Sequence, residues 1–269
     1  MTTSSLSPTV VQPARLSVSL VVALVVGAVA FSWPLFLTPA SGMPPILAPL
    51  VFALVLPMLL AVVLTELSAG RMDVKTLAML GVLAAVGTVL RPLSAGTAGF
   101  ELVFFLLILA GRAYGAGFGF ALGVITLFTS SLIVSGVGPW LPYQMLAAGF
   151  VGLFAGLLPK ASGQAEVWLL AGYGVISAFL YGWFMDFSFW PFAIGENTQL
   201  SFDPAATPLE NLYHFALFNL ATSMGWNLGR ALTNAALIAV LGTPLLRLLR
   251  RSARHVTVTP TAIPAPQPE

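Results

Sequence analysis

The chain has 269 residues, of which 58% are hydrophobic and only 7% are charged, and its mean hydropathy is +0.95. Soluble globular domains carry roughly 25% charged residues, so this composition excludes a water-soluble domain and predicts a membrane protein. The net charge of +2 argues against a nucleic-acid-binding surface, and the absence of cysteine excludes disulfides and thiolate metal sites.

Apolar runs of about 20 residues recur along the chain, which predicts an all-α, polytopic integral membrane helical bundle rather than a barrel. Residues 1–15 are rich in Ser, Thr and Pro and are expected to form a disordered cytoplasmic tail. The predicted spans are residues 16–38, 46–67, 76–90, 98–110, 118–134, 141–158 and 167–190. A polar loop, an interfacial helix near residues 212–222 and an eighth span from 224 to about 246 follow. A cleaved signal peptide is the alternative for the first span, but residues 38–42 are a poor cleavage site.

The basic residues predict the orientation, because short cytoplasmic loops collect Lys and Arg. With both termini in the cytoplasm, nine of the 11 basic residues lie inside: Arg15, Arg71, Lys75, Arg112, Lys160, Arg247, Arg250, Arg251 and Arg254. Arg91 and Arg230 do not fit and fall toward the outer surface. Ionisable residues inside a membrane are functional candidates by default.

Four charged residues are predicted near the outer surface. Arg230 lies about 25 Å along the last helix from its inner end and Asp186 about 28 Å along its own, so we expect that these two residues can pair. Arg91 and Glu101 flank the loop between the third and fourth spans and are expected to meet. The alternative is structural: Arg91 and Glu101 reach the lipid headgroups, and Asp186 pairs with Arg230 without touching a ligand.

Aromatic and amide side chains gather at the same depth, and together with these charges they predict an outward-facing pocket. The predicted substrate-binding residues are Arg91, Glu101, Trp140, Tyr143, Gln144, Asp186, Trp190, Trp226, Asn227 and Arg230. An interfacial aromatic belt is the alternative for any single aromatic residue.

Small residues recur at four-residue spacing, which lets helices approach closely. The stripes are Gly81 with Ala85, Ala84 with Thr88, Ala148 with Gly152 and Gly156, and Gly115 with Gly119 and Gly123. Packing inside the bundle is the commoner use of such stripes, and docking of another membrane subunit is the alternative.

Several catalytic motifs are missing from the sequence. Neither His214 nor His255 belongs to an H-E-x-x-H motif, and neither a phosphate-binding loop nor a G-x-S-x-G elbow occurs, so the chain is not expected to hydrolyse ATP. There is also no ladder of intramembrane acids or clear repeat of half-helices, which weakens an independent ion-coupled transporter. Active transport through this chain would therefore need energy supplied by a separate protein.

Four stretches carry a family resemblance: LAAVGTVLRP at 83–92, ELVFF at 101–105 leading to AGRAYG at 110–115, GVGPWLPYQM at 136–145, and WNLGRA at 226–231. They resemble the substrate-binding S component of energy-coupling factor (ECF) vitamin transporters. The resemblance implies a six-span core at residues 76–250, preceded by two additional spans within 16–67 and followed by a disordered tail at 251–269. It implies a multi-pass protein of the cell membrane that binds a small water-soluble vitamin from outside, without a cofactor, metal or catalytic residue.

The resemblance also implies partners and a substrate. Such a component docks onto a transmembrane coupling protein driven by two ATPases, and the matching docking residues are Gly81, Ala84, Ala85 and Thr88. The stretch around Trp140 and Tyr143 most resembles S components linked to cobalamin or another corrinoid.

Two alternative functions stay open. One is an intramembrane enzyme acting on a lipid or small molecule through Asp186, Glu101 and Arg230. The other is a structural membrane partner without a ligand.

Overall fold

The computed structural model describes residues 16–35, 47–69, 72–93, 99–192, 198–203 and 205–254. The tail expected at residues 1–15 and the last residues, 255–269, lie outside this part. The described residues form nine α-helices with short helical turns and no strand, which confirms the all-α fold class.

The α-helices are numbered in chain order. They are α1 (Val18–Ser32), α2 (Leu47–Ser68), α3 (Val74–Leu93), α4 (Phe104–Tyr114), α5 (Ala116–Ser130), α6 (Leu141–Leu157), α7 (Gly163–Phe189), α8 (Pro208–Thr222) and α9 (Met224–Arg254). Five helical stretches of the described chain, based on α1, α3, α5, α7 and α9, are long and apolar enough to cross a membrane, and α2, α4 and α6 supply shorter apolar helices. These eight elements correspond to the eight predicted spans, and α8 corresponds to the interfacial helix.

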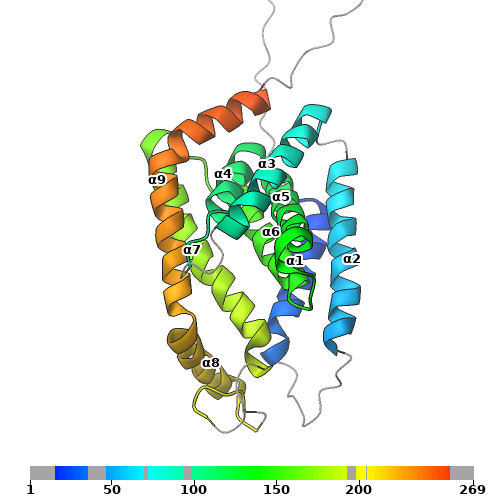
Figure 1. Ribbon diagram of the computed structural model, residues 1–269, viewed down its shortest axis with the longest axis vertical. Coiled ribbons are helices and arrows are strands. Elements are labelled where there is room, and N and C mark those ends of the chain that lie inside the picture. The colour runs from blue at the N-terminus through cyan, green and yellow to red at the C-terminus, as the bar shows by residue number, and fades with distance from the viewer. Residues whose placement is uncertain are drawn as a thin grey trace, which may run out of the picture.

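Polar contacts show which helix ends lie together. At one end Ser17, before α1, donates to Glu66 near the end of α2, and Arg250 of α9 binds Glu166 at the start of α7. At the opposite end α8 lies beside the start of α9, whereas the last turns of α9 cross the first end (Figure 1). We call these the inner end and the outer end, after the orientation predicted from the basic residues.

The centre of the bundle is formed by α4, α5 and α6, whose backbones touch at glycines. A Cβ atom placed on either Gly119 or Gly152 would lie 2.2 Å from the carbonyl oxygen of the other, and one on Gly123 would lie 2.4 Å from that of Ala148. No side chain fits at such separations. Packing within the bundle is therefore confirmed as the use of these two stripes.

The two N-terminal helices pack on α5, α6 and α7. The ring of Phe31 in α1 lies 5.5 Å from that of Tyr143 in α6 and 5.2 Å from that of Phe184 in α7. Glu66 in α2 is buried, and its Oε2 lies 2.5 Å from where a Cβ of Gly117 would be, so a larger residue at 117 would displace this carboxylate. We call α1 and α2 the N-terminal hairpin. α3 packs mainly on α5 rather than on this hairpin.

Helix α8 begins with a reciprocal cap. The Thr207 hydroxyl accepts from the backbone N–H of Glu210, while the Glu210 carboxylate accepts from the backbone N–H of Thr207. Hydrogen bonds from Thr207 hold the pKa of Glu210 below its ordinary value, so the cap is formed at neutral pH and is lost as the pH falls through that lowered pKa.

Two helix boundaries differ from the prediction. α4 begins at Phe104 rather than at residue 98, because the chain turns at Gly99, which has φ +87° and lies against the backbone carbonyl of Trp226. α9 continues through Pro244 to Arg254, past the predicted start of the tail at residue 251. Its last turns bury Leu246 and Leu249 against the bundle, and these contacts hold the helix together there.

Candidate functional site

The outer half of the bundle contains a polar network centred on Arg230 of α9, which is only 6% exposed. Its Nη2 donates to Glu101 Oε1 at 2.6 Å, in the segment before α4. Its Nη1 donates to the carbonyl oxygen of Ala178 in α7 at 3.2 Å and to Asn227 Oδ1 at 3.1 Å. Arg230 thus joins α7, α9 and the start of α4.

Two aromatic rings and one glycine shape this network. The guanidinium carbon of Arg230 lies 4.9 Å from the ring centre of Tyr181 and 5.5 Å from that of Phe104, which is cation–π range. A Cβ on Gly182 would lie 1.8 Å from Asn227 Oδ1, so only glycine leaves room for this amide. The guanidinium group of Arg230 therefore lies against both aromatic rings.

Two donors in the network have no hydrogen-bond partner among the described residues: Nδ2 of Asn227 and Nε of Arg230. Both side chains are buried. A buried donor left unsatisfied costs about 1–3 kcal/mol, so an acceptor brought to these two atoms would recover that free energy.

A second polar contact joins α3, α5 and α6 at the outer end. Arg91 donates from Nη2 to Gln144 Oε1 at 2.8 Å and from Nη1 to Ser130 Oγ at 3.4 Å. Arg91 and Gln144 are half-buried, and Gln144 lies in the first turn of α6. The structure thus brings together two of the predicted polar residues from helices far apart in sequence.

The predicted aromatic residues lie in three different surroundings. Trp140 and Trp226, at the starts of α6 and α9, are about half exposed. Tyr143 is half-buried against Phe31 of α1. Trp190 is only 1% exposed, and its Nε1 donates to the carbonyl oxygen of Leu200 at 2.7 Å. Trp190 is thus enclosed in a cluster under the outer loop, away from the Arg230 network.

The expected pairing of Arg230 with Asp186 is not the one found. Asp186 accepts from Asn219 Nδ2 of α8, whereas Arg230 pairs with Glu101. Arg230 reaches α7 at Ala178, which lies eight residues, or about 12 Å, before Asp186. Counting residues from the inner end of each helix did not predict this offset, because the count ignores that α7 runs obliquely to α9 (Figure 1).

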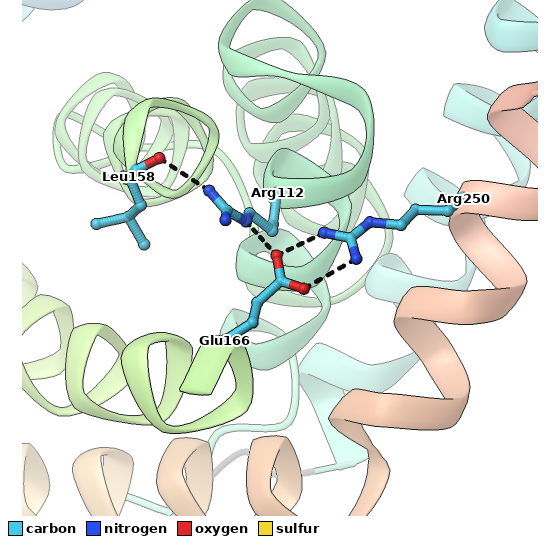
Figure 2. A network of polar contacts seen from close by, with 4 residues as sticks. All are labelled: Arg112, Leu158, Glu166 and Arg250. Atoms are coloured by element: carbon cyan, nitrogen blue, oxygen red, sulfur yellow. Dashed lines mark hydrogen bonds and ion pairs between the residues drawn. The ribbon is translucent and has the colours of Figure 1, made fainter. Parts of the chain in front are cut away.

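The inner end has its own ion network, shown in Figure 2. The side chain of Glu166 is 3% exposed, and its Oε1 accepts a hydrogen bond from Arg112 Nε at 2.6 Å. Arg250 donates from Nη1 to Glu166 Oε2 and from Nη2 to Glu166 Oε1. Arg112 also donates to the carbonyl oxygen of Leu158 at 2.8 Å. Sequence analysis placed both arginines inside but missed Glu166, an acid just before an apolar run.

The predicted docking residues divide between two faces of α3. Gly81 and Ala85 are exposed, and no atom lies within 4 Å of where a Gly81 Cβ would be. Ala84 and Thr88 are buried in the bundle. The exposed stripe continues through Val82, Val86 and Val89, so one face of α3 is apolar and exposed.

Apolar helices with paired charges inside them define a multi-pass membrane protein with a polar site in the outer half of its bundle. The chain belongs to the family described as ECF transporter, substrate-specific component, whose model matches residues 75–249. The match runs from α3 into α9 and leaves α1 and α2 outside. No curated protein and no solved structure matches the chain. Family membership thus makes it a substrate-binding component of a transporter rather than a member of an enzyme family.

Proposed function

We propose that this chain captures a small water-soluble vitamin from outside the cell membrane and delivers it with a separate coupling protein and two ATPases. Cobalamin or another corrinoid is the proposed substrate. Family membership supports a substrate-binding subunit. The observation that supports the site is the buried pair of Arg230 and Asn227, each with an unpaired donor.

The chemistry of the site favours a ligand that presents acceptor oxygens. Amide carbonyls or a phosphate would accept from Asn227 Nδ2 and Arg230 Nε, and bonds to a charged group contribute about 1.5–3 kcal/mol. The exposed rings of Trp140 and Trp226 would contact apolar parts of a large ligand. Arg91 and Gln144 would take polar groups at the opposite wall, and Tyr143, Asp186, Trp190 and Glu101 would support these contacts.

Docking would use the open face of α3. Gly81 and Ala85 let a partner helix approach closely, and the N-terminal hairpin packs on α5, α6 and α7 instead. Ala84 and Thr88, also proposed from the resemblance, would act indirectly by holding α3 on the bundle.

The intramembrane-enzyme alternative needs Asp186, Glu101 and Arg230 to act on one substrate atom. Glu101 is paired with Arg230, and Asp186 is bonded to Asn219 about two helical turns farther out. We therefore favour transport.

Two asparagines on the same face of α9 provide a matched test. Asn227 has an unpaired donor, Nδ2. Nδ2 of Asn234, two turns away, donates to the carbonyl oxygen of Gly174, and the unpaired atom of Asn234 is its acceptor Oδ1. Calorimetry with the purified protein should detect binding of one member of a vitamin panel that includes cobalamin. Asn227→Ala should weaken that binding about tenfold and Asn234→Ala should not. Binding of no vitamin, or equal effects of the two substitutions, would contradict the proposed site.

A further inference from the structure

A groove of about 690 Å³ runs between α7 and α8 at the outer end of the bundle. Its walls include Trp183 of α7, Leu212, Tyr213, Ala216 and Leu220 of α8, and Met224 at the start of α9. It lies apart from the Arg230 network, and the proposed vitamin site does not use these residues. Its volume is in the range of about 300–1,000 Å³ that small-molecule sites occupy.

Helix α8 turns its apolar side outward. Leu209, Leu212, Tyr213 and Leu220 are exposed and lie on one face, at helical spacing. Its amides point inward instead: Asn219 donates to Asp186, and Asn211 binds the backbone of the loop before the helix. A helix bathed in water has the reverse arrangement, so the exposed face of α8 is suited to an apolar environment.

The groove continues the lipid-facing surface of the neighbouring spans. On α7 the exposed residues Ile176, Leu180 and Trp183 follow one another toward the groove. On α9, Leu228 and Leu232 are exposed just beyond Met224. Exposed apolar side chains of membrane-spanning helices contact lipid tails, so lipid lies at both margins of the groove.

The lining also limits the chemistry of an occupant. Nearly all of it is apolar, and the Nδ2 of Asn219 is already bonded to Asp186. A polar ligand would lose its bonds to water without replacing them. From this chemistry and from the continuity with lipid-facing surfaces, we propose that the groove holds one acyl chain of an outer-leaflet phospholipid, with Trp183 and Tyr213 at the membrane interface.

Two alanines of α8 give a matched test. Ala216 lines the groove, whereas Ala221, also exposed, lies on the face that carries Glu210 and His214. Native mass spectrometry of the full chain released from phosphatidylcholine membranes should show one retained phospholipid. Ala216→Trp, which fills the groove, should lower its occupancy several-fold, and Ala221→Trp should leave it unchanged. Equal lipid retention by all three proteins would overturn the proposal. So would spectra in which the unsubstituted protein carries a second copy of the chain instead of lipid and Ala216→Trp loses that copy.

A second measurement does not depend on tolerance of a large side chain. Because the chain has no cysteine, Ala216→Cys and Ala221→Cys each accept a single fluorophore. Phospholipids with a nitroxide in mid-chain should quench the label at position 216 several-fold more than the label at 221, and aqueous iodide should show the opposite preference. Preferential quenching of position 216 by iodide would mean that the groove is filled with water and would refute lipid binding.

Discussion

Arg230 is a cation enclosed by apolar helices, and Glu101 is the anion that makes this burial tolerable. Glu101→Gln should destabilise the protein, because it leaves Arg230 buried without a counter-charge. Removing one partner of a fully buried pair costs about 3–5 kcal/mol, and the 29% exposure of the Glu101 side chain places the expected loss at or below the low end of that range.

Thermal unfolding in detergent would measure this loss, with Lys160→Gln, which removes an exposed charge, as control. The double substitution Glu101→Gln with Arg230→Gln should be less destabilising than the sum of the two single ones, because each single one leaves an unpaired charge and the double one leaves none. Strict additivity would mean that the pair is not coupled.

At the inner end the buried ion is Glu166, and two arginines bind its carboxylate. Arg250→Gln should lower the unfolding temperature, since it removes two hydrogen bonds from a buried anion, while Arg247→Gln on the exposed side of the same helix should have little effect. Vitamin affinity should not change, because Glu166 lies 12 residues, or about 18 Å, along α7 from the Arg230 contact at Ala178. A loss of affinity without a loss of stability would show coupling between the two ends.

At the scale of helices, the sequence predicted best those features that depend on one continuous stretch of chain. Apolar length predicted the eight apolar helices α1–α7 and α9, and an apolar run too long for one crossing predicted α8. The start of α4 could not be predicted, because it depends on Gly99 meeting the backbone of Trp226, which is distant in sequence. Pairing of Arg230 with Glu101 rather than Asp186 likewise depends on how α7 and α9 cross, which no single stretch of sequence determines.

Glycines on α3 and α5 have opposite surroundings, and substitution should separate docking from folding. Gly119→Leu should prevent correct folding, because its Cβ would lie 2.2 Å from a backbone oxygen of α6. Gly81→Leu should leave folding and vitamin binding intact, because its Cβ meets nothing, yet it should block uptake in cells by holding a partner helix away. Ala85→Leu is expected to behave like Gly81→Leu. Normal uptake by both would remove this face as the docking surface.

Across the whole molecule, α4, α7 and α9 are joined twice. The Arg230 network links the start of α4 to α7 and α9 in the outer half, and the Glu166 network links the same three helices at the inner end. Between these networks the helices present mainly apolar contacts. Such a frame resists sliding of one helix past another, because sliding would break two sets of buried ionic contacts at once.

The N-terminal hairpin lies outside the matched family region, yet Phe31 of α1 touches Tyr143, the residue before Gln144. Phe31→Ala should lower stability by about 3–5 kcal/mol, because it leaves a cavity where a buried ring contacted Tyr143 and Phe184. It should also weaken vitamin binding if α1 holds the first turn of α6 in place. Val29→Ala, at an exposed position of α1, is the control. Unfolding and calorimetry on both variants decide the matter: reduced stability with unchanged affinity would make the hairpin a brace for the bundle only, whereas a loss of both would make α1 part of the wall of the binding site.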